Sequence, residues 1–313
     1  MLQYLVILLD DAAASFCHYG ADGRAPRPMP ADVLRRGIRF AMTENLNVQF
    51  VYPATDVPAD VAALVESVDH VKIKPAGAPG PADVVVCDGF GRLPSGPAEG
   101  VTYVLRTDRA SLFDRYGELA PVLARAARLN VVLTDVERFA DADAGRYAAA
   151  LDALAALLTE QYAAGRTPQL NVLTDRLLLT GMNNCGAGET CLTLAPDGRF
   201  YVCPAFYYAP DATAVGSLGE GPDVPNPQLY RLDHAPLCRR CDAWQCRRCV
   251  WLNRRTTLEV NTPGHEQCVA AHVEREASRR LLERMRAAGI VLPGAQEIKK
   301  LDYLDPFDVR ETW

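Results

Sequence analysis

The sequence predicts an α/β protein in which six parallel strands form an incomplete barrel, followed by a small cysteine-rich domain. Three observations lead to this prediction. Short apolar runs alternate with longer amphipathic segments through the first half of the chain, an order typical of right-handed βαβ units on a parallel sheet. Proline or glycine separates many of these segments. Eight of the ten cysteines lie between Cys185 and Cys268, and so dense a set is typical of metal ligands.

The first expected strand is the apolar run of residues 3–9, which fits a strand buried on both faces. A loop follows it, and a helix is expected from 31 to 44. Further strands are expected at residues 48–52, 71–74, 83–87, 101–105 and 130–133. Further helices are expected at residues 58–67, 110–127 and 143–164. Residues 170–173 then lead into the cysteine-rich segment.

The second half predicts a hairpin and a long helix. Pro196, Asp197 and Gly198 form a turn between two strand-like runs, which indicates a β-hairpin. An amphipathic helix is expected over residues 271–288, ending at Gly289. The expected domains are a barrel over 1–180, a cysteine-rich domain over 181–289 and a tail over 290–313. The tail's aromatic residues suit either a partner surface or packing on their own domain.

Composition excludes several classes of protein. The chain has 313 residues, 49% of them apolar, so it can bury a large core. The net charge is −6 and no basic stripe interleaved with aromatics is present, which argues against nucleic-acid binding. No apolar run approaches 18 residues, so no membrane span is expected. The start lacks a basic segment and a small-residue cleavage site, so a strand is expected there rather than a signal peptide, and the expected location is the cytoplasm.

The cysteine set admits three chemistries. Disulfides need an oxidising compartment, which nothing in the sequence indicates. Zinc favours pairs of Cys-x2-Cys knuckles a dozen or more residues apart, and here only four residues separate the knuckles 238–241 and 246–249, although interleaved zinc sites remain an alternative. Iron–sulfur cubanes need four thiolates each, and eight cysteines supply two complete sets. Two [4Fe-4S] clusters are therefore the preferred interpretation, with Zn²⁺ as the alternative.

The cysteine block resembles a SPASM domain, the twin-cluster extension of many peptide-modifying radical SAM enzymes. Cys185 is followed by Gly198-x4-Cys203, and a later block reads Cys-x2-Cys-x4-Cys-x2-Cys with one more cysteine after it. The family has x5 and x3 in place of x4 and x2. The resemblance implies one cluster on Cys185, Cys191, Cys203 and Cys249. It implies a second cluster on Cys238, Cys241, Cys246 and Cys268.

The layout of barrel and SPASM domain is that of radical SAM peptide enzymes, but the motif of their catalytic cluster is missing. In that family the loop after the first strand carries Cys-x3-Cys-x2-Cys, and the cluster held there binds S-adenosylmethionine. This loop carries only Cys17, and Cys87 is the other cysteine of the first 184 residues. The glycine-rich element expected after the second strand is also absent. We therefore expect this chain to bind no S-adenosylmethionine.

A resemblance over nearly the whole chain is to the CXXX repeat peptide maturase family. It rests on residues 4–11, 15–19 and 37–53 together with the cysteine block. The resemblance implies a role in maturing a ribosomally made, cysteine-repeat peptide. Because eight cysteines fit the SPASM pattern and the N-terminal half has fewer than three, we expect an accessory subunit that pairs with a separate radical SAM enzyme in a heterodimer. The alternatives are a stand-alone iron- or thiol-dependent peptide-modifying enzyme and a zinc-stapled peptide-binding scaffold.

Individual residues suggest further roles. Asp11, Cys17 and His18 follow the first strand, where α/β folds bind ligands, and a cysteine beside a histidine suits a nucleophile or redox thiol. The alternative is a loop with capping aspartates and a packed cysteine. Three histidines flank the cluster region: His234, His265 and His272. Any of them could replace a thiolate, but eight cysteines already suffice, so they are expected to be neighbours of the clusters or surface residues. Six arginines give the 238–255 segment a local charge of +5 and suit an anionic cluster, an acidic peptide or a solvated loop: Arg239, Arg240, Arg247, Arg248, Arg254 and Arg255.

Overall fold

The computed structural model describes residues 1–20, 24–179, 185–243, 246 and 249–298. Its contacts divide the chain into two units, each made of two segments. Unit 1 comprises Met1–Asp88 and Cys185–Arg231, and unit 2 comprises Gly89–Asn184 and Leu232–Trp313. Each unit is an α/β structure with parallel strands, as the sequence predicts. The expected domains differ from these units, because each is one continuous stretch of the chain: 1–180, 181–289 and 290–313. This division stays a prediction.

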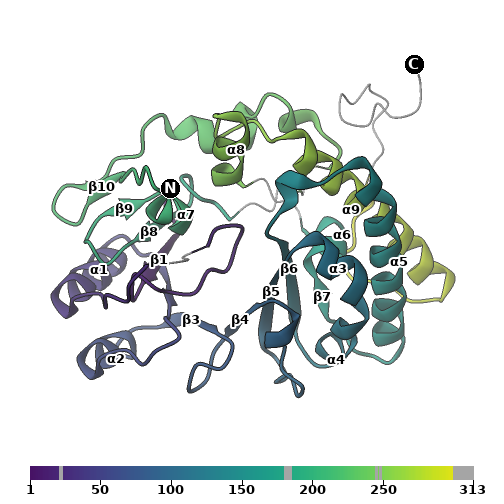
Figure 1. Cartoon of the computed structure of the whole chain (residues 1–313), viewed down its shortest axis with the longest axis horizontal. Coiled ribbons are helices and arrows are strands. Elements are labelled where there is room, and N and C mark those ends of the chain that lie inside the picture. Colours follow the sequence, from purple (N-terminus) through teal and green to yellow (C-terminus); the bar gives the residue numbers. More distant parts are fainter. Residues whose placement is uncertain (21–23, 180–184, 244–245, 247–248, 299–313) are drawn as a thin grey trace. The chain divides into compact units, whose positions relative to one another are not determined.

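Unit 1 is built on the strand β1, Tyr4–Leu8, whose apolar side chains are almost all buried. Parallel strands continue from β1 in the order β2, Asn47–Val51, then β3, His70–Pro75, then β4, Val84–Asp88. The helices α1, Ala31–Thr43, and α2, Ala59–Val65, connect these strands (Figure 1). All four strands lie where the sequence predicts them.

The expected hairpin is present and extends the same sheet. β8, Cys191–Leu194, pairs antiparallel with β9, Phe200–Tyr201. Gly198 lies in the turn at φ +77°, a backbone conformation that glycine adopts without strain. β8 also pairs in parallel with β1, placing Tyr4 opposite Cys191. The sequence does not predict this pairing. Unit 1 is completed by α7, Pro204–Tyr208, and a small antiparallel pair, β10, Gly216–Ser217, with β11, Gly221–Pro222.

Unit 2 has three parallel strands flanked by helices. β6, Arg128–Leu133, pairs with β5, Thr102–Thr107, on one side and with the short β7, Gln169–Leu170, on the other. The long helices α5, Asp141–Ala163, and α9, His265–Ala287, pack against each other (Figure 1). The shorter α6, Asn171–Leu178, packs against both α9 and β6. α8, Val250–Thr257, lies between the cysteine loop and α9 in the chain.

Two expected helices differ from the observed ones. The expected helix 110–127 is divided into α3, Arg109–Arg115, a 3₁₀ turn, Tyr116–Leu119, and α4, Ala120–Leu123. Gly117 and Pro121 explain the interruption, because glycine weakens a helix interior and proline lacks the amide donor. The helix expected over 271–288 begins six residues earlier, at His265. Cys268 is therefore a helical residue.

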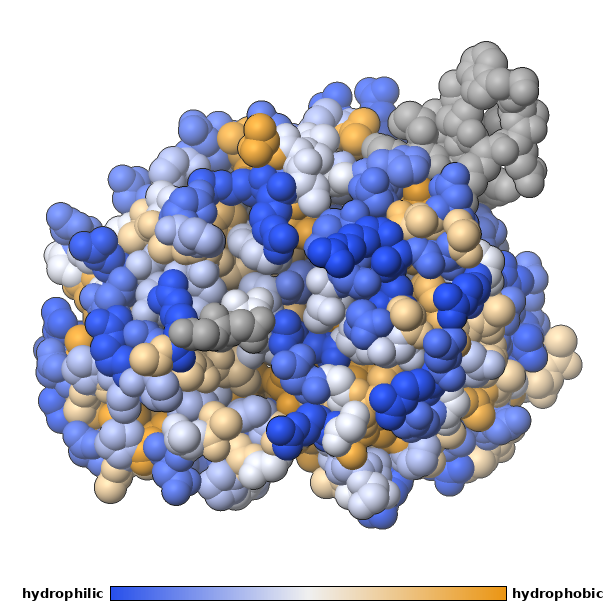
Figure 2. Space-filling model, in the orientation of Figure 1, coloured by the Kyte–Doolittle hydropathy of each residue, from blue (hydrophilic) through white to orange (hydrophobic). Residues whose placement is uncertain are grey.

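The outer surface is mostly polar on the face that Figure 2 shows, where apolar side chains form small separate groups. Among the described residues, no helix combines the length and the apolar character that crossing a bilayer requires.

Gly37 of α1 provides a test of this packing. A Cβ atom at this position would overlap the buried Leu194 side chain of β8 and contact Ile7 of β1. Gly37→Ala is therefore expected to lower the free energy of unfolding by about 1–3 kcal/mol. Gly145→Ala in α5 is the matched control, because nothing lies within 4 Å of its added methyl group. It is expected to stabilise by up to about 1 kcal/mol. Denaturant unfolding measures both, and equal effects would contradict this account.

Candidate metal centre

Helix α9 presents the polar residues of a candidate metal centre in unit 2. The helix begins after Pro263 and Gly264, carries Glu266 in its first turn, and has arginines in its last turn, as the helix dipole favours. Cys268, His272 and Arg275 follow one another at spacings of four and three residues. Because 3.6 residues make one turn, their side chains share one face of α9.

The loop that carries three further cysteines lies in the same unit. Cys238 begins a 3₁₀ turn, Cys238–Arg240, and its side chain is buried. Burial raises the pKa of the Cys246 thiol to about 12, and the neighbouring Cys238 and Cys241 thiols add to this shift while Arg176 opposes it. Three of the four cysteines predicted for the second cluster therefore share one electrostatic neighbourhood. Such a set of sulfur donors fits an iron–sulfur cluster or a thiolate-bound zinc ion.

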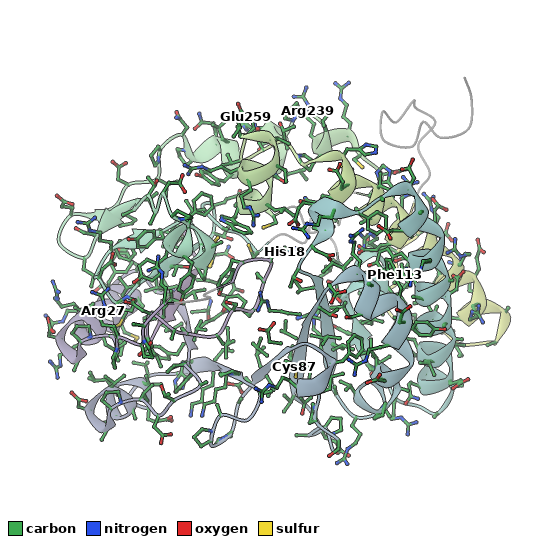
Figure 3. The ribbon with its side chains drawn as sticks, in the orientation of Figure 1. His18, Arg27, Cys87, Phe113, Arg239 and Glu259 are labelled. Atoms are coloured by element: carbon green, nitrogen blue, oxygen red, sulfur yellow. The ribbon has the colours of Figure 1, made fainter. Side chains whose placement is uncertain are left out.

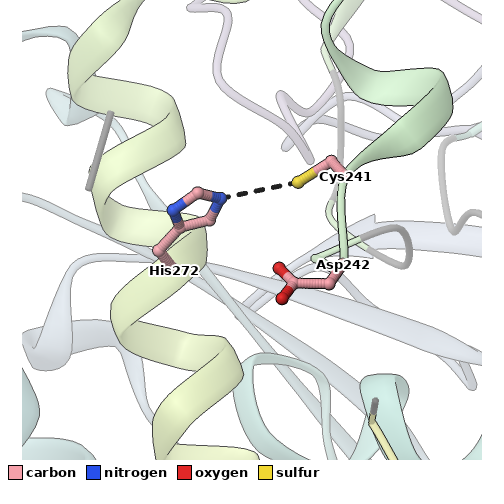
Figure 4. A group of neighbouring side chains, drawn as sticks. All are labelled: Cys241, Asp242 and His272. Atoms are coloured by element: carbon pink, nitrogen blue, oxygen red, sulfur yellow. Dashed lines mark hydrogen bonds between the residues drawn. The ribbon is translucent and has the colours of Figure 1, made fainter. Parts of the chain in front are cut away.

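Cys241 faces α9 directly. Its Sγ lies 3.5 Å from Nε2 of His272, and the amide of Ala243 donates to the same sulfur at 3.3 Å. Figure 4 shows the imidazole projecting from α9 toward the thiol, with the Asp242 carboxylate beside them. The ligand atoms of Cys241, Asp242 and His272 all lie within 4.8 Å of one another. Sequence reasoning treated His272 as a neighbour or surface residue, yet its side chain is buried.

A buried ion pair fixes this loop to the helix. Asp242 accepts a hydrogen bond from Arg275 Nη1, and each of the two side chains is at least 94% buried. Arg275 Nε also donates to Glu276 at 3.0 Å, and Arg279 Nη2 lies 3.9 Å from the other oxygen of Asp242. Two consecutive loop residues, Cys241 and Asp242, thus contact α9 residues three positions apart. The loop's register on the helix is thereby set.

A second buried arginine approaches the thiols from α6. Arg176 Nη2 donates to Glu274 of α9 at 2.6 Å, and Tyr147 of α5 donates to the same carboxylate at 2.7 Å. Arg176 is only 2% exposed, and its Nε atom is buried without a hydrogen-bond partner among the described residues. A buried guanidinium with an unused donor, close enough to lower the pKa of Cys246, fits an anionic group held by these thiolates.

Unit 1 holds three of the cysteines predicted for the other cluster. Cys185 and Cys191 are brought together by a tight turn in which the Cys191 amide donates to the Gly186 carbonyl at 2.8 Å. Burial raises the pKa of Cys191 to about 12, with a further contribution from Cys185. Cys203 precedes α7 and is half-buried. The fourth predicted ligand, Cys249, belongs to unit 2, where its sulfur accepts a hydrogen bond from Leu252 at the start of α8.

The loop after β1 is filled by ion pairs and tyrosines. Asp11 is buried, with one oxygen accepting from Arg27 Nε at 2.7 Å and the other from the Tyr207 hydroxyl. Tyr19 stacks on Tyr208 with ring centroids 5.5 Å apart. Arg24 covers the Tyr207 ring at 4.4 Å. Asp11 thus has structural partners at both of its carboxylate oxygens.

Cys17 and His18 lie in the same loop, half-buried (Figure 3 labels His18). The pKa of Tyr19 is raised well above its ordinary value, mainly by burial, with contributions from Cys17, Tyr208 and Cys203. Cys17 therefore lies in the electrostatic neighbourhood of one predicted cluster ligand. The catalytic role expected for Cys17, His18 and Asp11 stays a prediction.

The remaining predicted residues occupy various places. Cys87 is buried on β4, and burial raises its pKa to about 12, as befits a core thiol (Figure 3). Arg239 and Arg240 are exposed, and Arg255 lies over the Trp251 ring at 4.9 Å. His234 lies 3.2 Å from the Asp233 carboxylate. Arg247, Arg248 and residues 299–313 of the tail lie outside the described residues.

Comparison with known proteins shows the fold but no family. No family model matches the chain. No curated protein matches it either. Among solved structures, a hexahistidine-tagged anSMEcpe with bound AdoMet is similar at a TM-score of 0.56 and 13% identity, covering 90% of this chain and 98% of that one. Native anSMEcpe with bound AdoMet and Cp18Cys peptide is similar at a TM-score of 0.52 and 12% identity, covering 92% and 100%. The chain therefore has an α/β fold of parallel strands and helices similar to that of the anSMEcpe structures.

The ion pair between Asp242 and Arg275 can be tested through stability. Arg275→Ala leaves a buried carboxylate without its main partner, so the free energy of unfolding is expected to fall by about 3–5 kcal/mol. Arg280→Ala on the same helix is the control, because its ion pair with Asp152 at 2.9 Å is more than 40% exposed on both sides. Its expected cost is below about 1 kcal/mol. Denaturant unfolding of the metal-free proteins measures both, and similar losses would refute the anchoring role of Asp242.

Proposed function

We propose that this protein is a SAM-independent accessory subunit in the maturation of a ribosomally synthesised, cysteine-repeat peptide. In this proposal it carries two auxiliary [4Fe-4S] clusters and pairs with a separate radical SAM enzyme in a cytoplasmic heterodimer. It binds neither nucleic acid nor a membrane.

The observation that carries the proposal is the gathering of thiols in unit 2 beside an unused buried donor. Cys238, Cys241 and Cys246 share one neighbourhood, and Arg176 Nε lies buried there without a partner among the described residues. An iron–sulfur cluster bound by thiolates carries negative charge, which a buried guanidinium offsets. Core packing alone gives no reason to bury an arginine with an unused donor.

In this proposal, each group of residues has a definite task. Cys238, Cys241, Cys246 and Cys268 hold the cluster of unit 2, and Cys185, Cys191, Cys203 and Cys249 hold the other. When bound, such clusters supply one-electron transfer. Arg275 fixes the loop through Asp242, while Glu274 and Tyr147 orient Arg176 toward the thiolates.

The absence of a SAM-binding cluster is proposed from the loop after β1. That loop supplies one cysteine, Cys17, where three are needed. Its buried carboxylate, Asp11, is held by Arg27 and Tyr207, and tyrosine rings pack around it. These contacts support a loop with a packing role. The structures of anSMEcpe contain AdoMet and, in two cases, a peptide, which supports a peptide as the substrate of the complex to which this chain contributes.

A zinc-stapled, peptide-binding scaffold is the second candidate. It is favoured by one observation, the close approach of a sulfur and a nitrogen donor, because Sγ of Cys241 lies 3.5 Å from Nε2 of His272. Structural zinc sites in proteins use these donor types.

Metal analysis of the anaerobically purified full chain tests the proposal. Two cubanes predict about eight iron and about eight acid-labile sulfide per chain. A result of about two zinc with little iron would refute the cluster proposal and favour the scaffold.

Arg176→Met is expected to shift the reduction potential of one cluster to lower values, since the variant removes a positive charge beside it. Arg128→Met, which removes the ion pair with Asp175 of α6, is the control and is expected to leave the potential unchanged.

The accessory role is tested with AdoMet and with Cys17→Ser. The isolated chain is expected to leave AdoMet uncleaved, and to co-purify with the radical SAM enzyme that acts on the same peptide. Peptide maturation by the pair is expected to survive Cys17→Ser. A stand-alone enzyme that uses Cys17, His18 and Asp11 predicts the opposite, namely loss of maturation in that variant. Reproducible AdoMet cleavage by the chain alone would overturn the accessory role.

A further inference from the structure

We propose that His272 is a ligand of the metal group in unit 2 and takes the place assigned to Cys268. The inference depends on the proposed function for the three thiolates Cys238, Cys241 and Cys246, and it changes the fourth ligand.

The position of the imidazole carries the inference. Nε2 of His272 lies 3.5 Å from Sγ of Cys241, and the side chain is 95% buried. Among the described residues, one group of at least three Cys, His, Asp or Glu side chains could hold a metal ion. The ligand atoms of this group all lie within 4.8 Å of one another. Its members are Cys241, Asp242 and His272 (Figure 4), and the other predicted ligands of this centre, Cys238, Cys246 and Cys268, are outside it. A buried imidazole beside a set of thiols is itself a metal donor.

The carboxylate of this group is not free to bind a metal. Arg275 donates to Asp242 from the same helix, and Arg279 approaches its second oxygen. Asp242 therefore acts as an anchor, and Cys241 and His272 supply the sulfur and nitrogen donors of this group. Because Arg275 stands three residues after His272, the same ion pair that holds the loop also holds Cys241 against the imidazole.

The location of Cys268 is consistent with this exchange. It lies one turn before His272 on the same face of α9, so both approach the loop from the same direction. Its side chain is half-buried, as are those of Cys241 and Cys246, whereas that of His272 is buried. Iron–sulfur proteins also accept histidine in place of cysteine, and the exchange raises the reduction potential because a neutral ligand replaces an anionic one.

The test compares two single variants of the full chain, purified anaerobically. His272→Ala is expected to lose the metal group of unit 2. Because the proposed chain holds two cubanes, iron and sulfide are then expected to fall to about half of the wild-type content. Cys268→Ser is expected to keep the wild-type content. The reverse result, or full retention in both variants, would overturn the assignment.

A third variant covers the case in which His272→Ala does not fold. His272→Cys supplies a thiolate at the same position, so it is expected to retain the cluster with a reduction potential below that of the wild type. An unchanged potential and spectrum would show that residue 272 does not bind the cluster.

The wild-type metal separates this inference from the proposed function. If the wild type contains zinc and no sulfide, the cluster proposal fails. The ligand is then identified from the zinc content per chain, which is expected to fall in His272→Ala and to stay at the wild-type level in Cys268→Ser. A wild-type chain that binds neither iron nor zinc under these conditions would refute both.

Discussion

The candidate centre of unit 2 depends on one buried ion pair, that between Asp242 and Arg275. Removing two charges from water is costly, and their attraction offsets this cost only where the geometry is good and further hydrogen bonds are present. Here Glu276 and Arg279 complete the arrangement. A pair of this kind specifies position more than it adds stability. What it specifies is the distance between the cysteine loop and α9, and with it the approach of Cys241 to His272.

Helix α9 joins this loop to the rest of unit 2. Ser278 donates to the Leu173 carbonyl of α6 at 2.8 Å, and Glu274 receives both Arg176 and Tyr147. Apolar residues of the same helix, among them Leu281 and Met285, are completely buried. The polar face and the apolar face of one helix thus serve two tasks. The apolar face secures the helix in the unit, and the polar face presents His272 to Cys241 and Arg275 to Asp242.

Much of the fold follows from the sequence, because it depends on local patterns. Short apolar or alternating runs identify β1 to β6, and the Pro-Asp-Gly turn identifies the hairpin of β8 and β9. The parallel pairing of β8 with β1 depends on contacts between distant segments, which no local pattern contains. The start of α9 at His265 was missed because charged residues obscure its apolar period. The thiols of the candidate centre were predictable from their spacing. The burial of His272, Asp242 and Arg176 was not predictable, since a buried polar residue cannot be told from a surface one without its neighbours.

The pairing of β1 with β8 has a consequence for how the chain is made. β1 has β2 on one side and β8 on the other, so it is an interior strand of its sheet. Tyr4 leaves the ribosome before its partner Cys191, which is synthesised only after the whole first segment of unit 2. Throughout that interval the second edge of β1 is an open, apolar strand edge, and such edges recruit other strands. The hairpin that covers it also brings Cys191 and Cys203 into the unit. The thiols of Cys191 and Cys203 therefore join unit 1 only at a late stage of folding, after translation has passed the hairpin.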